Sequence, residues 1–169
     1  STDGGLQWTR VTTATTAYDV ALGPEQRVFS IFDGRAWYTT DEGNAWHPVD
    51  NSALQGLDTA GASGDGSGLF MAAGPILYRY DLASNSLVTA TTDLPIGDIE
   101  QIALSPQFGT DQTVWIGAPD GVWVSHDAGI SFVRAPGFTT FALRSVSVAA
   151  GSGGSDIFAA GEEGIWRLR

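Results

Sequence analysis

The sequence predicts an all-β protein made of four repeated units. Asp33-Gly34 and Asp120-Gly121 each stand between alternating apolar runs, and Glu163-Gly164 stands in a third such run, a pattern typical of β-hairpins. These landmarks return after about 40 to 45 residues, the period of an array of small structural repeats. No segment has a convincing helical pattern, because 22 Gly, 7 Pro and many Thr and Val disfavour helices.

Each unit contains four predicted strands in the same order. A first apolar strand precedes a second strand that ends at the Asp-Gly turn or its equivalent, and a third strand, a second tight turn and a fourth strand follow. The weakest copy of the first turn is Gly74-Pro75, between Phe70 and Tyr78. The four first strands are expected around residues 20–22, 59–62, 102–104 and 146–148. Four short antiparallel strands at this period are the composition of a β-propeller blade.

The second turn carries a motif of its own. Ser/Thr-x-Asp-x-Gly-x-x-aromatic occurs at 1–8, 39–46 and 125–132. The short polar side chains can bond N–H groups across the turn, the Gly suits a left-handed φ, and the aromatic ring starts the fourth strand and is buried. We therefore expect structural roles for the motif residues Asp3, Gly5, Trp8, Asp41, Gly43, Trp46, Asp127, Gly129 and Phe132.

This motif resembles the BNR or Asp-box repeat of sialidases, sortilin-type receptors, xyloglucan-cleaving hydrolases and a photosystem assembly factor. The resemblance implies a β-propeller of the bacterial type, with the boxes on one face and any ligand near the axis on the opposite face. Because unrelated functions share the box, the resemblance implies an architecture and no particular activity.

The spacing of the boxes indicates the number of blades. Asp41 follows Asp3 by 38 residues, and Asp127 follows Asp41 by 86, which leaves room for one degenerate copy at Asp81. In that copy Asn85 stands loosely in place of the Gly, and Leu87 replaces the aromatic residue. A single domain over residues 1–169 with about four four-stranded antiparallel blades follows.

The chain begins at a box and ends after a third strand, so its two ends are complementary. Residues 1–13 can supply the fourth strand of the last blade and so remove an exposed sheet edge. The predicted blades are 17–50, 54–95, 96–137, and 141–169 together with 1–13. Two other arrangements also fit the pattern: two chains that form an eight-bladed ring, and an excised part of a longer propeller.

Composition narrows the range of partners. The net charge is −11 and all eight basic residues are Arg, which argues against nucleic acid and anionic membrane surfaces as partners. Cys is absent, and the two histidines, His47 and His126, lie at or beside boxes without a second ligand, so no metal site and no cofactor is predicted. No apolar run reaches the roughly 18 residues of a transmembrane helix.

Candidate binding residues lie on the face opposite the boxes. When the repeats are aligned, four charged residues share one slot at the mouth of the central channel: Asp19, Asp58, Glu100 and Arg144. Asp33, Asp120 and Glu163 mark the hairpin turns further out on the same face. A ring of acids with one arginine can bind a cation, a sugar or a basic peptide, although each residue alone also fits a solvated loop end.

Three functions remain open at this stage. The favoured one is a non-enzymatic binding or assembly module outside the cytoplasm, extracellular, at the cell surface or periplasmic, which takes a protein or carbohydrate partner as a monomer or a homodimeric ring. The alternative is a fragment or minimal version of a glycoside hydrolase, with a carboxylate pair about 5 to 9.5 Å apart drawn from Asp19, Asp58 and Glu100. The third is an engineered or excised repeat array without a function of its own.

Overall fold

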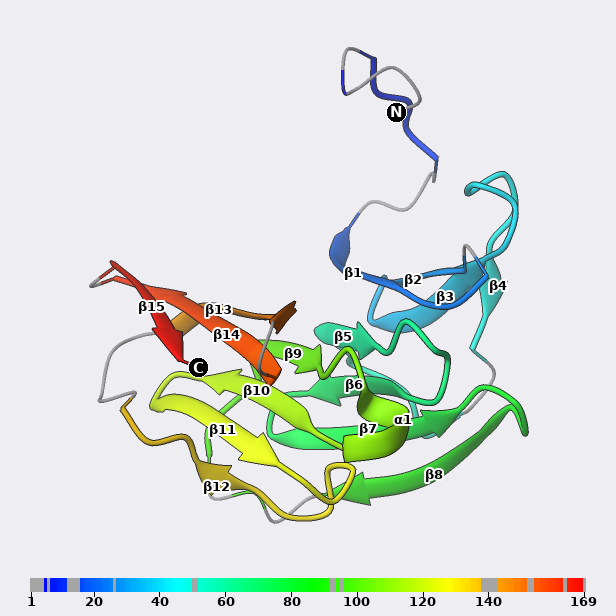
Figure 1. The fold of residues 1–169 in the computed structure, drawn as a ribbon. Helices are drawn as coiled ribbons and strands as arrows, with labels where there is room; N and C mark the ends of the chain where they lie inside the picture. Colours follow the sequence, from blue (N-terminus) through cyan, green and yellow to red (C-terminus); the bar gives the residue numbers. More distant parts are fainter. Residues whose placement is uncertain are drawn as a thin grey trace.

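The protein folds as a four-bladed β-propeller, as the sequence predicts. The computed structural model describes residues 5, 7–11, 16–25, 27–49, 52–91, 94, 96–137, 143–151, 154–162 and 164–168. Four antiparallel sheets are arranged about a common axis (Figure 1). In the described residues three sheets have four strands and the last has three.

The strands follow one another from the axis outward in each blade. Blade 1 contains β1 (Ala17–Leu22), β2 (Val28–Phe32), β3 (Arg35–Thr39) and β4 (His47–Pro48). Blade 2 contains β5 (Thr59–Ala62), β6 (Leu69–Ala73), β7 (Ile76–Asp81) and β8 (Ser86–Thr91). Blade 3 contains β9 (Gln101–Leu104), β10 (Val114–Ala118), β11 (Gly121–Ser125) and β12 (Val133–Arg134). Blade 4 contains β13 (Leu143–Gly151), β14 (Gly154–Gly161) and β15 (Gly164–Leu168).

The expected first strands are the innermost strands of the blades. β1, β5, β9 and β13 line one cavity of about 390 Å³ along the axis. The Asp-Gly turn of blade 1 has the geometry expected of a two-residue hairpin, because both Asp33 (φ 54°) and Gly34 (φ 68°) are left-handed. The turn holds β2 and β3 in the register that pairs Phe32 with Arg35.

Apolar clusters fill the spaces between consecutive blades. One joins blades 1 and 2 through residues such as Phe29 and Tyr80, a second joins blades 2 and 3 through Phe70 and Ile116, and a third joins blades 3 and 4 through Trp115. The sheets of blades 2 and 3 thus place alternate residues in two different interfaces, which explains why their middle strands are apolar on both faces. Most of the core lies between sheets.

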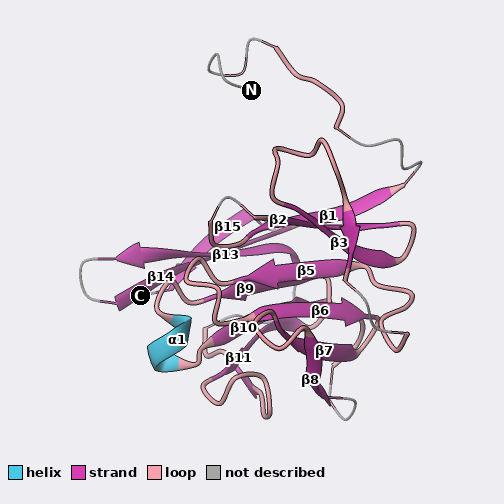
Figure 2. Cartoon of the chain, turned by 90° about the vertical axis from the view of Figure 1, so that its right-hand side faces the viewer, coloured by secondary structure: helices cyan, strands magenta, loops and turns pink. Residues whose placement is uncertain are grey.

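One helical turn departs from the prediction that the chain has no helix. α1 (Phe108–Asp111) lies in the loop between β9 and β10 (Figure 2). Ser105 Oγ accepts a hydrogen bond from Gln107 N at 3.1 Å and donates one to Asp111 Oδ2 at 2.6 Å, while Phe108 is fully buried. Local polar bonds and one buried ring form this turn without any helical periodicity in the sequence.

The described part of the N-terminal segment is not where the sequence placed it. Residues 1–13 were expected as the fourth strand of blade 4, but residues 7–11 form no strand and run away from the body of the molecule in both views (Figures 1 and 2). Val11 instead lies against blade 1: its carbonyl accepts a hydrogen bond from Trp46 Nε1 at 3.0 Å, and its side chain occupies the space beside Gly43. Trp8, expected to be buried, is 82 % exposed.

Candidate functional site

The two fully described boxes are built alike, as turns whose polar side chains bond the backbone. In the box of blade 3, Ser125 Oγ donates to Asp127 Oδ1 at 2.7 Å and accepts from Gly129 N at 2.8 Å. Asp127 also accepts from the backbone N–H and the hydroxyl of Ser131, at 2.9 and 2.5 Å. Every one of these bonds closes the turn, which is the structural role expected from the motif.

The box of blade 1 repeats this network with different side chains. Thr39 Oγ1 donates to Asp41 Oδ1 at 2.7 Å and accepts from Gly43 N at 3.1 Å, and Asp41 Oδ1 accepts from Ala45 N at 2.9 Å. The motif glycines are left-handed as predicted, with φ of 92°, 87° and 84° at Gly5, Gly43 and Gly129. Asp3 of the first box lies outside the described residues.

The degenerate box of blade 2 keeps the Asp and changes the rest of the turn. Asp81 Oδ1 accepts from Ala83 N at 2.8 Å and from Ser84 N at 3.2 Å. Asn85 takes a left-handed φ of 51°, and its side chain accepts a hydrogen bond from Tyr80 Oη at 3.0 Å. Asn tolerates this conformation better than most residues, which explains how the turn persists without the Gly.

Hydrogen bonds stabilise the ionised form of the box carboxylates. Burial raises the pKa of Asp127, but bonds from Ser131, Ser125 and Ile130 outweigh it and bring this pKa down to about 2. The N–H groups of Ala45 and Ala83 lower the pKa of Asp41 and of Asp81, respectively. Carboxylates held in this way serve the turn and are poor proton donors.

A further acid on the same side links two blades. Asp65, in the loop between β5 and β6, accepts from the hydroxyl and N–H of Ser67 at 2.6 and 3.0 Å and from Gly109 N of α1 at 3.2 Å. The Ser67 hydroxyl is the main reason that its pKa falls to about 2. The sequence does not single out this residue, because a Gly-Ser stretch by itself indicates only a loop between strands.

The opposite face, which we call the turn face, carries the second-to-third-strand turns and the beginnings of the innermost strands. Backbone bonds place these two sets side by side: Asp33 N donates to Thr16 O at 3.1 Å, Ile99 N to Gly74 O at 2.9 Å, and Glu100 N to Gly117 O at 2.8 Å. The aligned residues Asp19, Asp58, Glu100 and Arg144 therefore lie at the same end of the four innermost strands.

Asp19 is used by the fold itself. Its Oδ2 accepts from Thr59 Oγ1 at 2.6 Å and from Ala60 N at 2.9 Å, and its Oδ1 accepts from Val20 N at 2.8 Å. Both Thr59 and Ala60 belong to blade 2, so the carboxylate ties the innermost strands of two blades together at the channel mouth. This bridging role was not anticipated in the sequence.

The other three residues of the slot differ in the hydrogen bonds and ion pairs that they form. Asp58 is exposed, and its Oδ2 accepts from Gly74 N at 3.1 Å. Arg144 pairs with exposed Glu162 at 3.2 Å. Glu100 and the neighbouring Asp98 are exposed, and no hydrogen bond or ion pair to either carboxylate is found in the described part of the chain. Asp98, which the alignment of repeats missed, adds a further acid next to this mouth.

The hairpin-turn acids lie on the turn face but serve local structure. Asp120 Oδ1 accepts from Trp123 Nε1 at 3.0 Å, and the Asp120 carbonyl accepts from Arg134. Asp33 occupies the left-handed turn position described above and is exposed. Glu163 lies outside the described residues.

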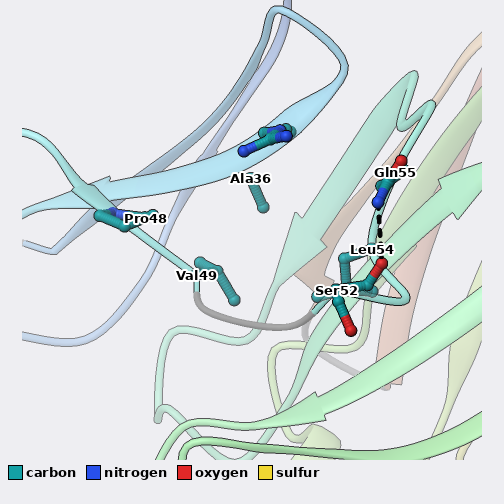
Figure 3. A pocket seen from close by; sticks show the side chains of 7 residues that line it. Ala36, Pro48, Val49, Ser52, Leu54 and Gln55 are labelled. Atoms are coloured by element: carbon teal, nitrogen blue, oxygen red, sulfur yellow. Dashed lines mark hydrogen bonds between the residues drawn. The ribbon is translucent and has the colours of Figure 1, made fainter.

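A second hollow, of about 240 Å³, lies at the outer junction of blades 1 and 2 (Figure 3). Ala36, Val49 and Leu54 form its buried apolar wall, and Ser52 and Gln55 line it from the connection between the blades. Gln55 Nε2 donates to the Ser52 carbonyl at 3.0 Å, so both groups are partly used by that connection. Sequence patterns gave no signal for this hollow because connection and strands meet only in the folded chain.

Within the residues that the structure describes, no group of three or more His, Asp or Glu side chains is placed to hold a metal ion. Among the same residues no helix is long and apolar enough to cross a membrane.

Comparison with solved structures identifies the same fold in larger proteins. A chain of a nidogen/laminin complex superposes with a TM-score of 0.70 at 8 % identity, over 92 % of this chain and 60 % of that one. The extracellular domain of a one-component system from B. thetaiotaomicron gives 0.67 at 15 % identity, over 93 % and 21 %. Both are β-propeller structures, and this chain spans less than two thirds of either.

At these identities the likeness shows the fold alone. No family model matches the sequence, and a search of curated proteins finds no match either.

Proposed function

We propose that this protein is a non-enzymatic binding module that takes a protein or carbohydrate partner on its turn face, outside the cytoplasm. The observation that carries the proposal is the contrast between the carboxylates of the boxes and two acids at the channel mouth. On the box face Asp41, Asp81 and Asp127 are held by bonds that close their own turns. On the turn face the exposed carboxylates of Asp98 and Glu100 have no such bond among the described residues.

The chemistry of the channel mouth suggests what a partner offers. Exposed carboxylates accept hydrogen bonds from the hydroxyls of a sugar and attract the cationic side chains of a basic peptide. The solved neighbours give general support, since one comes from a protein–protein complex and the other is an extracellular domain. Asp58 offers a further carboxylate for such contacts, because the bond from Gly74 N uses only its Oδ2.

The rival function, a glycoside hydrolase, has less support. A hydrolase needs one carboxyl group that gives up a proton and a second that acts as base or nucleophile. Asp19 accepts three hydrogen bonds from the protein, so it is committed to a structural link. Only Asp58 and Glu100 of the expected set then remain as a catalytic pair.

Binding to glycan arrays and to immobilised Arg- and Lys-rich peptides tests the proposal. We expect saturable binding to one of these probes, and at least about tenfold weaker binding by Glu100→Gln and Asp58→Asn, because a charge-assisted hydrogen bond contributes roughly 1.5–3 kcal/mol. Glu42→Gln is the matched control, since Glu42 is an exposed acid on the box face. Failure to bind either probe, or equal loss in the control, contradicts the proposal; turnover of glycosides that Glu100→Gln abolishes supports the hydrolase instead.

A further inference from the structure

The three packed junctions between blades follow one register, so equivalent positions can be compared. On the second strand of each blade, one position faces the next blade: Phe29, Phe70, Trp115 and Phe158. The first three are at most 7 % exposed, because the following sheet covers them. Phe158 of blade 4 is 37 % exposed.

The third strands show the same break in the pattern. The position that faces the next blade is Ala36, Leu77, Val122 and Ile165 in successive blades. The first three are at most 3 % exposed, whereas Ile165 is 79 % exposed. Phe158 and Ile165 lie on the side of their sheet opposite Val146, Ile157 and Ala159, which pack against blade 3. We call this side the blade 4 face.

In blade 1, the residues that would face a preceding blade are exposed. On the innermost strands, the position that faces the preceding blade is Val20, Ala60, Ile102 and Val146. The last three are at most 4 % exposed, whereas Val20 is 62 % exposed and Leu22, two residues further along the same side, is 72 % exposed. We call this side the blade 1 face. Within the described residues no apolar cluster joins blades 4 and 1.

We propose that these two faces are the halves of a fourth blade–blade junction that a second copy of this chain completes. The blade 4 face of one copy packs on the blade 1 face of the other, in the register that the three internal junctions already use. Such a head-to-tail contact forms a closed ring when the rotation between copies closes. Two copies related by a two-fold axis fill both open junctions and give eight blades, within the usual range of propellers.

The charges on the blade 4 face fit burial in such a contact. Arg167, which pairs with Phe158 across the sheet, bonds Asp156 Oδ2 at 2.6 Å and lies over the Phe158 ring at 5.6 Å. The guanidinium is therefore neutralised within its own blade and needs no partner from the second copy. The remaining repulsion comes from the net charge of −11 on each copy, so added salt strengthens the association.

Light scattering of the intact chain and two surface variants tests the head-to-tail pairing. Wild-type protein is expected at twice the 17.7 kDa chain mass. Val20→Glu and Ile165→Glu each put a carboxylate into both junctions of a homodimer and so disrupt them. Each variant is therefore expected at the monomer mass. Mixed together, the two variants retain one junction built only from native faces, so a heterodimer is expected to form. Ile130→Glu, at an exposed apolar residue of a box, is the control that keeps the wild-type mass.

Circular dichroism first establishes that each variant is folded, which is expected because both side chains are exposed. A monomeric wild-type chain that stays monomeric in high salt overturns the proposal, and so does a ladder of masses beyond the dimer, which indicates an open chain of copies. Variants that dimerise alone, or that fail to complement each other, show a different interface and also overturn it.

Discussion

At the scale of single residues, the box acid and its neighbours act as one hydrogen-bonded unit. The Ser125 hydroxyl accepts a hydrogen bond from the N–H of Gly129 and donates one to Asp127, and Asp127 in turn accepts one from Ser131 N on the far side of the turn. The left-handed Gly129 makes this geometry accessible. The motif is thus explained by turn closure without invoking a ligand.

The Asp127 unit and the Asp65 link between blades 2 and 3 together predict a loss of stability in acid. The pKa values of Asp127 and Asp65 are lowered to about 2 from the ordinary 3.8, so their contribution is fully present above pH 3.8 and is lost as the pH falls towards 2. Urea unfolding should therefore show a falling midpoint over this window. Asp127→Asn should cost roughly 1–2 kcal/mol at neutral pH and weaken the pH dependence.

The control for this measurement is Glu42→Gln, which removes a charge from another box without removing a hydrogen bond of the turn. If Asp127→Asn unfolds with the same midpoint and the same acid dependence as the wild type, the carboxylate does not stabilise the turn as described.

At the scale of elements, the innermost strands decide how closely two blades approach. A Cβ added to Gly61 of β5 would lie 2.8 Å from Ile102 Cγ2 and 2.9 Å from Ile102 O in β9. The Asp19 carboxylate fastens the other side of β5 to β1 through Thr59. Contacts on both sides of β5 therefore fix the position of blade 2 at its inner edge.

Gly61→Ala should force β5 and β9 apart and destabilise the protein by about 1–3 kcal/mol, the usual cost of overpacking. Gly64→Ala is the matched substitution, because nothing lies within 4 Å of a Cβ at that position and its φ is not left-handed. Thermal or urea unfolding of the two variants gives the comparison. Equal stability of both would contradict a tight approach of the two strands.

At the scale of the whole molecule, the outer edge of blade 4 distinguishes the structure from the arrangement expected in the sequence. Among the described residues, β15 is the outermost strand of a three-stranded sheet, whereas β7 lies between β6 and β8. A fourth strand would pair β15 on both sides like β7, but the described residues 7–11 form no strand. Val11 is held at Trp46 of blade 1 instead.

Hydrogen exchange followed by mass spectrometry tests this difference in solution. Peptides that cover β15 should exchange faster than peptides that cover β7, because an edge strand has ladder partners on one side only. A second copy on the blade 4 face covers side chains and leaves this edge unpaired, so the expectation holds for monomer and dimer alike. Equal protection of both strands would mean that another segment pairs with β15.

The sequence predicts those features of the fold that depend on interactions between residues close together in the chain. The Asp-Gly turn at Asp33, the left-handed Gly of the boxes and the order of strands depend on residues within a few positions of one another, and all are confirmed. α1 escaped prediction, since the burial of Phe108 and the contact of Asp65 with Gly109 depend on packing between blades.

The sequence by itself determined the four-blade all-β repeat and the side of each blade on which the boxes lie, because turn chemistry and alternation are local. It also predicted the slot shared by Asp19, Asp58 and Glu100. Only the tertiary structure decided that Asp19 joins two blades, that Glu100 is left exposed, and that Val20 and Ile165 lack the cover their equivalents have. These outcomes depend on which sheet stands beside which, and a repeat pattern that is equal in every unit carries no information on that point.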